Sequence, residues 1–246
     1  MSQPKKRLDQ LLVEKELLVS WQRAQGLIMA GLVTVDGKRV DKPGHLVNPS
    51  ASIELTGPDH PYVSRGGIKL EAALQEFSID VSGLTILDVG ASTGGFTDCL
   101  LQHGAKKVFA VDVGYGQLAW SLRNDPRVVV LERTNIRHLS PSEIQAHLDG
   151  AVIDTSFISL KIVVPATVRH LGKGSFILAL IKPQFEAGKD MVGKGGLIRD
   201  EALHKKILSD LAAFFSDAGL SVCGTFESPI KGAKGNREVF IYLKYL

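Results

Sequence analysis

From residue 85 onward, short runs of consecutive apolar residues alternate with stretches of helical periodicity. The runs that predict strands are Thr85–Val89, Lys107–Val111, Val128–Leu131, Ala151–Asp154, Phe176–Ile181, Ser221–Phe226 and Val239–Tyr242. Helical patterns fall at Phe96–His103, Leu160–His170 and Glu201–Ala218. Continuous apolar runs are typical of parallel strands buried on both faces, and their alternation with helices indicates a doubly wound sheet. We therefore predict an α/β fold with a seven-stranded, mostly parallel sheet whose last strand is antiparallel, because no helical segment separates the last two strands.

The first sixty residues follow a different pattern. Leu8, Leu11 and Leu12 have helical spacing, and a second helix is predicted from an N-cap at Ser20. Asp36-Gly37 between short apolar runs predicts a two-residue hairpin. We expect a small α+β domain over residues 1–60, a linker over 61–64 and a second domain over 65–246.

Composition excludes several classes of protein. With 44% hydrophobic residues and a net charge of +3, the chain can bury a core and permits a polyanionic partner without requiring one. Its two cysteines, Cys99 and Cys223, form neither a metal-binding pattern nor a disulfide framework, and both are predicted to be small core residues. No metal site is expected. No signal peptide or run of about 20 apolar residues is found, so we expect a cytoplasmic protein that needs no membrane.

A glycine-rich turn follows the first predicted strand of the sheet. The segment from Gly90 to Phe96 has the spacing GxxxGG, which differs from the GxGxxG of dinucleotide-binding folds. Asp112 ends the next strand, where such folds place a carboxylate that binds ribose hydroxyls. The two features together suit an adenosine-bearing ligand, although a tight turn and a solvent-facing aspartate would give the same pattern.

This strand-turn-strand pattern resembles the S-adenosylmethionine-dependent methyltransferases, which have a Rossmann-like class I fold. The resemblance implies that the glycine turn wraps the methionine part, that Asp112 holds the ribose and that Asn135 meets the adenine. The residues expected to bind the cofactor are Asp88, Gly90, Ser92, Thr93, Gly94, Gly95, Phe96, Asp112, Asn135 and Asp154. An aspartate is common at the position of Asn135 in related enzymes, so the adenine contact is open.

Four ionisable residues stand at predicted strand ends or helix starts: Lys69, Asp154, Lys182 and Glu238. Charges at the rim of a buried sheet are costly unless they are paired, and two lysines with two carboxylates balance. A ribose hydroxyl becomes a nucleophile when a base removes its proton. We expect Lys182 to be that base, Lys69 and Glu238 to position the ribose, and Asp154 to bridge cofactor and Lys182. The alternative is a set of unrelated surface salt bridges.

The whole chain resembles the TlyA (haemolysin A) family of ribosomal-RNA ribose methyltransferases. The segments that carry the resemblance are Arg7-Leu8-Asp9, the Asp36-Gly37 hairpin, Tyr62–Leu70, Asp88–Phe96, Asp154–Leu160 and Ile181–Glu186. The front domain is similar to the S4-type RNA-binding domain. The remainder resembles the FtsJ-like 2′-O-methyltransferases, whose Lys-Asp-Lys-Glu tetrad falls on the four residues above. The family implies methylation of cytidine 2′-OH in ribosomal RNA of the ribosomal subunits.

Basic residues of the front domain and of two later segments are expected to contact RNA phosphates. They are Lys6, Arg7, Arg23, Lys38, Arg39, Arg65, Lys189 and Lys194. A solvated charged face and an ordinary loop are the alternatives. Two other functions stay open: a membrane-lytic protein, since some family members carry the name haemolysin, and a non-catalytic RNA-binding factor of ribosome assembly. We expect a monomer or a weak dimer.

Overall fold

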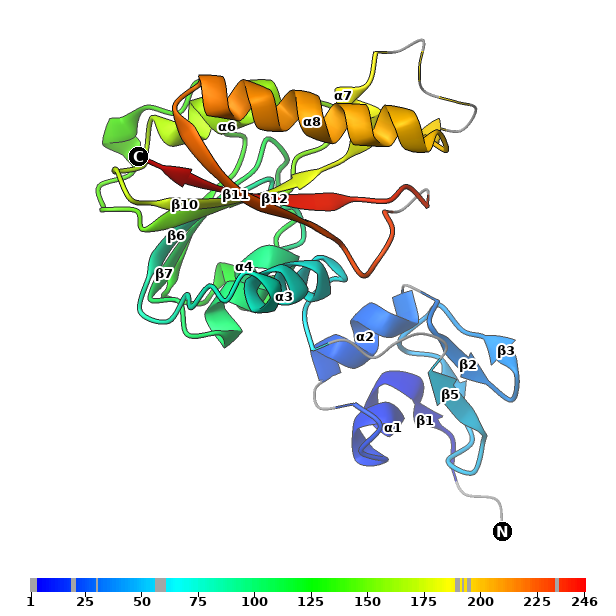
Figure 1. The fold of residues 1–246 in the computed structure, drawn as a ribbon. Helices are drawn as coiled ribbons and strands as arrows, with labels where there is room; N and C mark the ends of the chain where they lie inside the picture. Colours follow the sequence, from blue (N-terminus) through cyan, green and yellow to red (C-terminus); the bar gives the residue numbers. More distant parts are fainter. Residues whose placement is uncertain are drawn as a thin grey trace. The chain divides into compact units, whose positions relative to one another are not determined.

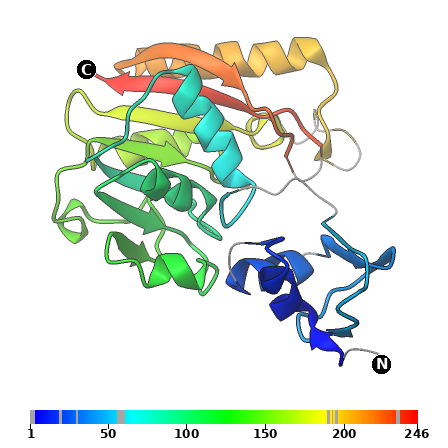
Figure 2. The same ribbon diagram turned by 90° about the horizontal axis from the view of Figure 1, so that it is seen from below.

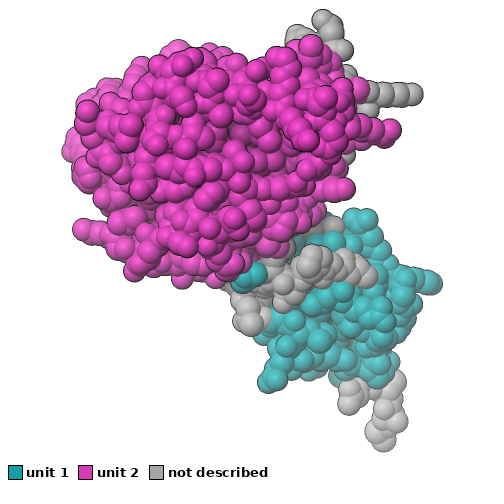
Figure 3. All heavy atoms as spheres, in the orientation of Figure 1, with its two compact units in different colours: residues 1–61 teal, residues 62–246 magenta. Residues whose placement is uncertain are grey.

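A computed structural model describes residues 4–18, 21–29, 31–55, 61–188, 191, 193, 196–232 and 235–246. The chain divides into two compact units, Met1–Pro61 and Tyr62–Leu246 (Figure 3). The division falls beside the start of the predicted linker. Each unit has its own hydrophobic core and is described by itself.

The first unit is a small α+β module. Its elements are β1 (Lys6–Arg7), α1 (Leu8–Glu14), α2 (Trp21–Met29), β2 (Val33–Val35), β3 (Lys38–Arg39), β4 (Leu46–Val47) and β5 (Ile53–Leu55). Strand β2 is the centre of an antiparallel sheet in the order β3-β2-β5, and β1 pairs with β4. Asp36 and Gly37 both have positive φ, at 49° and 74°, as the predicted hairpin requires. The helices pack Leu8, Leu12 and Ile28 into the core.

The second unit contains a seven-stranded sheet. Its strands are β6 (Thr85–Val89), β7 (Lys107–Val111), β8 (Val128–Leu131), β9 (Gly150–Ile153), β10 (Phe176–Ile181), β11 (Leu220–Glu227) and β12 (Val239–Tyr245). The order is β11-β12-β10-β9-β6-β7-β8, and β12 is antiparallel to both of its neighbours. The predicted fold class is therefore confirmed, and four of the seven strands have the predicted bounds.

Helices cover both faces of this sheet (Figures 1 and 2). The helical elements are α3 (Gly66–Glu76), α4 (Gly95–Gln102), α5 (Trp120–Arg123), η1 (Pro141–Glu143), α6 (Leu160–Val168), α7 (Pro183–Glu186) and α8 (Glu201–Asp217). One core lies between the sheet and helices α3 and α4, and a second lies between the sheet and helices α6 and α8. Alternate residues of each central strand, such as Ile86 and Leu87, enter the two cores. This double burial explains why the strands read as continuous apolar runs.

The reversed direction of β12 sets which residues meet at one edge of the sheet. Ile181 at the end of β10 is paired with Val239 at the start of β12. Lys182 and Glu238, the next residue outward on each strand, therefore lie at the same edge as the carboxyl ends of β6, β7 and β9. Ligands of open α/β sheets bind at this edge.

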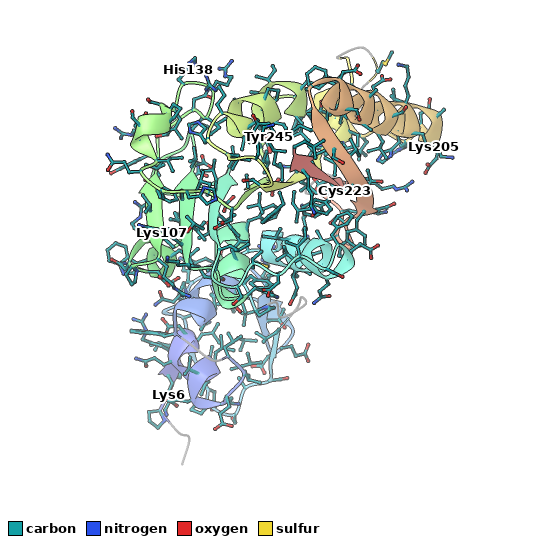
Figure 4. All side chains as sticks on the ribbon, turned by 60° about the vertical axis from the view of Figure 1, so that its left-hand side comes forward. Lys6, Lys107, His138, Lys205, Cys223 and Tyr245 are labelled. Atoms are coloured by element: carbon teal, nitrogen blue, oxygen red, sulfur yellow. The ribbon has the colours of Figure 1, made fainter. Side chains whose placement is uncertain are left out.

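The expectation that both cysteines are core residues is wrong for Cys223. Cys99 is buried in α4, whereas Cys223 is exposed on the outer strand β11 (Figure 4). A register shift between Val222 and Gly224 leaves Cys223 opposite no residue of β12. An unpaired residue at a bulge in an edge strand is turned out of the core, and the sequence pattern does not reveal bulges.

Candidate active site

The glycine turn between β6 and α4 is held by close packing of protein atoms. Gly90 and Gly94 have φ values of +88° and +97°, which residues with a Cβ rarely adopt. A Cβ on Gly90 would also lie 2.6 Å from the carbonyl oxygen of Asp154. The turn therefore brings the end of β6 against the end of β9 and fixes the backbone around Ser92 and Thr93.

Asp88 lies beneath this turn and is completely buried. The hydroxyl of Thr97 donates to its Oδ2 at 2.6 Å, while its Oδ1 has no hydrogen-bond partner among the described residues. Burial raises the pKa of Asp88 to about 7, and the bond from Thr97 acts in the opposite direction. Of the predicted cofactor residues, Asp88 and Gly94 line neither of the two pockets described below.

A pocket of about 510 Å³ opens beside the ends of β6, β7 and β9. Asp112 and Asn135 line it together with apolar side chains such as Ile136 and Val163. Asp112 is anchored because the backbone N–H of Ser92 donates to its Oδ2 at 2.8 Å and that of Gly114 to its Oδ1 at 2.7 Å. A fixed carboxylate can still accept from the two hydroxyls of a ribose, and the apolar walls suit a flat base. The anchored carboxylate and the apolar walls of the pocket thus fit an adenosine-bearing ligand.

Asn135 also lines this pocket and is held by a hydrogen bond. Its Oδ1 accepts from the backbone N–H of Arg137 at 3.1 Å, which leaves the amide Nδ2 to act as a donor. Thr155 also lines the pocket, and its Oγ1 is buried without a partner among the described residues. Buried polar atoms are normally satisfied, so this hydroxyl and the Asn135 amide are two groups that a bound ligand could engage.

A second pocket, of about 280 Å³, adjoins the first, since Gly90, Ser92, Asp154 and Ser156 line both. Lys69, Asp154 and Lys182 form part of its wall. Lys69 Nζ donates to Glu238 Oε2 at 2.5 Å, and Lys182 Nζ lies 2.5 Å from Asp154 Oδ1. The structure therefore brings the four predicted catalytic residues together as two ion pairs around one pocket.

Both ion pairs are largely withdrawn from water. The side chains of Lys69 and Lys182 are 12% and 11% exposed, and those of Glu238 and Asp154 are 4% and 22% exposed. Removing one partner of such a pair leaves a charge that is buried and uncompensated, which is costly. The pairs consequently fix both amines in place at the pocket wall. Ser92, Thr93, Gly95 and Phe96 of the glycine turn line the same pocket.

Several pocket residues are absent from the sequence predictions. The hydroxyl of Ser156 accepts from Lys182 Nζ at 3.0 Å and so orients that amine. Ser64 and Lys231 line the 280 Å³ pocket, and Phe157 lines the 510 Å³ pocket with φ +65° and 89% exposure. The position of Ser156, two residues after Asp154, is a signal that could have been used. Nothing local to Lys231 indicates a pocket.

The predicted RNA-binding residues are spread over both units. Lys6 pairs with Glu14 at 2.6 Å, and Lys38 is exposed on β3 beside Arg39. Arg65 lines the 280 Å³ pocket. The side chain of Arg23 and the residues Lys189 and Lys194 lie outside the part of the chain that the structure describes.

Arg7 has a structural role as well. Its guanidinium donates to both carboxylate oxygens of Asp9, at 3.0 and 2.8 Å, and lowers the pKa of that buried carboxyl to about 2. Gln25 of α2 donates to the same carboxylate at 3.2 Å. The pair thus ties β1 and α1 to α2, and the charge of Arg7 is already partly neutralised.

Comparison with known proteins supports this description of both units. Residues 62–245 match the model of the FtsJ-like methyltransferase family, and residues 6–53 match that of the S4 domain. No helix in the described ranges is both long and apolar enough to span a bilayer.

Full-length relatives show the same resemblance. A 16S/23S rRNA (cytidine-2′-O)-methyltransferase TlyA from Mycobacterium tuberculosis is 47% identical over 97% of this chain and 89% of that protein. A protein named Hemolysin A from Brachyspira hyodysenteriae is 44% identical over 94% of this chain and 97% of its own. A solved structure from Streptococcus thermophilus superimposes with a TM-score of 0.77 at 44% identity, covering 98% of this chain and 89% of that one.

Proposed function

The chain belongs to the FtsJ-like methyltransferase family, and we propose that it transfers the methyl group of S-adenosylmethionine to a ribose 2′-hydroxyl of ribosomal RNA, with cytidine as the target nucleoside. The observation that carries this proposal is the pair of lysine–carboxylate contacts around a pocket that adjoins a nucleoside-sized pocket. Such an arrangement can bind an adenosine in one pocket and offers, in the other, groups that can act on a hydroxyl.

The residues around the two pockets fit the cofactor. In this proposal Asp112 accepts hydrogen bonds from the ribose, and Asn135 donates to the adenine edge. The backbone from Gly90 to Phe96 would hold the methionine part, and the N-terminus of α4 would suit its carboxylate. When bound, S-adenosylmethionine supplies a methyl group on a sulfonium that a nucleophile can attack. Asp154 lines both pockets and therefore bridges the cofactor and Lys182.

The lysines and carboxylates act on the hydroxyl. Lys182 takes the proton of the 2′-OH at its Nζ, after releasing its own proton to solvent. Asp154 at 2.5 Å and the hydroxyl of Ser156 at 3.0 Å then hold the ammonium that forms. Lys69, fixed by Glu238, positions the ribose and stabilises the developing negative charge on its oxygen. A 2′-oxygen held in this way by Lys69 and Lys182 would be ready to accept the methyl group that bound S-adenosylmethionine would supply.

An RNA substrate agrees with the S4 match of the first unit and with the exposed basic residues on it. Residues 6–53 match the S4 domain, and the TlyA relative acts on 16S and 23S rRNA by its name. Lys38 on β3 is exposed, as a phosphate contact requires. The substrate proposed here is a ribosomal subunit or its RNA, bound by a monomer or a weak dimer without a membrane.

The test is transfer of tritium from labelled S-adenosylmethionine to purified ribosomal RNA and ribosomal subunits, followed by mapping of the 2′-O-methyl sites. We expect Lys182→Ala to lower the rate at least a hundredfold, because removal of a general base typically costs that much. Lys106→Ala, an exposed lysine before β7 at the other edge of the sheet, is the matched control.

Equal labelling by wild type and Lys182→Ala would refute the assignment of the base. RNA binding without any methyl transfer, on subunits and on whole ribosomes, would instead indicate an assembly factor. Leakage of liposomes caused by the purified protein without cofactor would support the lytic alternative.

A further inference from the structure

The pocket of about 280 Å³ has more positive than negative charge. Its wall includes Arg65, Lys69, Lys182 and Lys231, against Asp154 and, behind Lys69, Glu238. Lys69 is neutralised by Glu238 and Lys182 by Asp154. Arg65 and Lys231 have no hydrogen-bond or ion-pair partner for their side chains among the residues that the structure describes. These two cations are therefore available to an anionic ligand.

The backbone that carries Lys231 is anchored beside the proposed catalytic carboxylate. The backbone N–H of Ser228 donates to the carbonyl oxygen of Glu238 at 2.9 Å, and that of Gly232 donates to Asn236 O at the same distance. Gly232 lies so close to Glu238 that a side chain at this position would overlap the Glu238 carboxylate. Lys231 is thus presented to the pocket from a fixed point, although its own side chain is exposed.

No neighbouring carboxylate in the described part of the chain forms an ion pair with Lys231. Glu227, at the end of β11, is bound by Arg237, whose Nε and Nη2 donate to its two oxygens at 2.9 and 2.6 Å. The pKa of Glu227 is lowered first by this bond, and the charge of Lys231 contributes only as the last of its causes. The positive charge of Lys231 is accordingly directed at whatever enters the pocket.

The geometry of a nucleotide indicates which anionic group would enter the pocket. The 2′-oxygen of a ribose is on the carbon next to the one whose 3′-oxygen carries a phosphodiester. An RNA that places its 2′-OH at Lys182 therefore brings a phosphate to the same pocket. A lysine ammonium is a compact charge that binds phosphate oxygens without a directional requirement. We propose that Lys231 binds a phosphodiester flanking the target ribose; this inference rests on the proposed function.

The experiment compares wild type with Lys231→Gln, Lys231→Arg and the control Lys106→Gln. Methyl transfer to ribosomal RNA is measured over a range of salt concentrations, and S-adenosylmethionine binding is measured by calorimetry. Loss of one phosphate contact means that about one counterion fewer is released when RNA binds. At ~0.1 M salt the KM for RNA of Lys231→Gln should therefore rise about five- to tenfold. The slope of log KM against log salt concentration should be smaller by about 0.7 to 0.9. We expect kcat and cofactor affinity to be unchanged, Lys231→Arg to restore the KM, and Lys106→Gln to match wild type.

Three results would overturn the inference while wild type remains active on RNA. The first is a KM and a salt slope of Lys231→Gln that equal those of wild type. The second is a weaker cofactor affinity, which would assign Lys231 to the methionine carboxylate. The third is a lower kcat at unchanged KM, which would assign Lys231 to the chemical step. If wild type itself transfers no methyl group to RNA, the proposed function fails, and this inference fails with it.

Discussion

Asp88→Asn should make the stability of the second unit less dependent on pH. The wild-type carboxyl is fully buried, and its pKa is raised from 3.8 to about 7. A carboxyl with a raised pKa binds a proton more tightly in the folded chain than in the unfolded chain. Its contribution to stability is complete below the unfolded pKa of about 4 and is lost as the pH rises through about 7. From pH 5 to pH 8 the loss covers about two pH units, or about 3 kcal/mol.

Asparagine keeps the shape and can still accept the 2.6 Å hydrogen bond from Thr97, but it does not ionise in this range. The free energy of unfolding is measured by urea titration with far-UV circular dichroism at pH 5 and pH 8. The difference between variant and wild type is taken at each pH, so that contributions of the first unit cancel. Asp217→Asn, an exposed carboxylate at the end of α8, is the control. If wild type and Asp88→Asn lose the same stability between the two pH values, Asp88 does not titrate as the burial argument requires.

Three further predictions concern the two units separately. Asp9→Asn should destabilise the first unit by about 2 kcal/mol at pH 7, because it weakens hydrogen bonds to a charged group. The deficit should shrink as the pH falls from the unfolded pKa of about 4 to the folded pKa of about 2, because the unfolded wild-type carboxyl takes up its proton first; urea unfolding at pH 7 and pH 2 checks this. Gly90→Ala should weaken S-adenosylmethionine binding at least about tenfold in calorimetry, since a side chain at positive φ costs about 1–2 kcal/mol and the Cβ would displace the backbone of Asp154. Asp112→Asn should weaken the same binding about tenfold or more with little loss of stability, and an unchanged Kd would exclude Asp112 from the ribose contact.

Patterns along the sequence predict the parts of this fold that burial on both faces determines. The bounds of β6, β7, β8 and β10 follow from runs of mainly apolar residues, because a strand covered on both sides buries most of its side chains; the buried Asp88 in β6 is an exception. The outer strand β11 is different: its residues alternate between half-buried and exposed, and its bulge at Cys223 depends on pairing with β12. Sequence periodicity contains no information about that pairing.

The site shows the same limit. Lys69, Asp154, Lys182 and Glu238 could be selected because each charge stands at the end of an apolar run or in a motif of the family. The pairing of Lys182 with Asp154 follows from the strand order, in which β10 lies beside β9. The pairing of Lys69 with Glu238 depends instead on the packing of helix α3 against the sheet. Lys231 escapes prediction because its place on the pocket wall depends on the packing of Gly232 against Glu238, a contact within a loop.

Arg7 illustrates a third limit. A basic residue in an RNA-binding module is easily assigned to a phosphate, yet its guanidinium forms two hydrogen bonds with the buried Asp9. Whether a charge is available to a partner depends on the side chains around it: Arg7 is bound by Asp9, two residues along the chain, and Gln25 of α2 donates to the same carboxylate.

The contrast between the two sulfur atoms gives the chain a convenient chemical handle. Burial raises the pKa of the Cys99 thiol to about 12, so little reactive thiolate is available at neutral pH. Cys223 faces solvent on the outermost strand. A maleimide dye should therefore attach at one position without any engineered cysteine, and fluorescence anisotropy of the labelled protein would test the proposed binding to a ribosomal particle in real time.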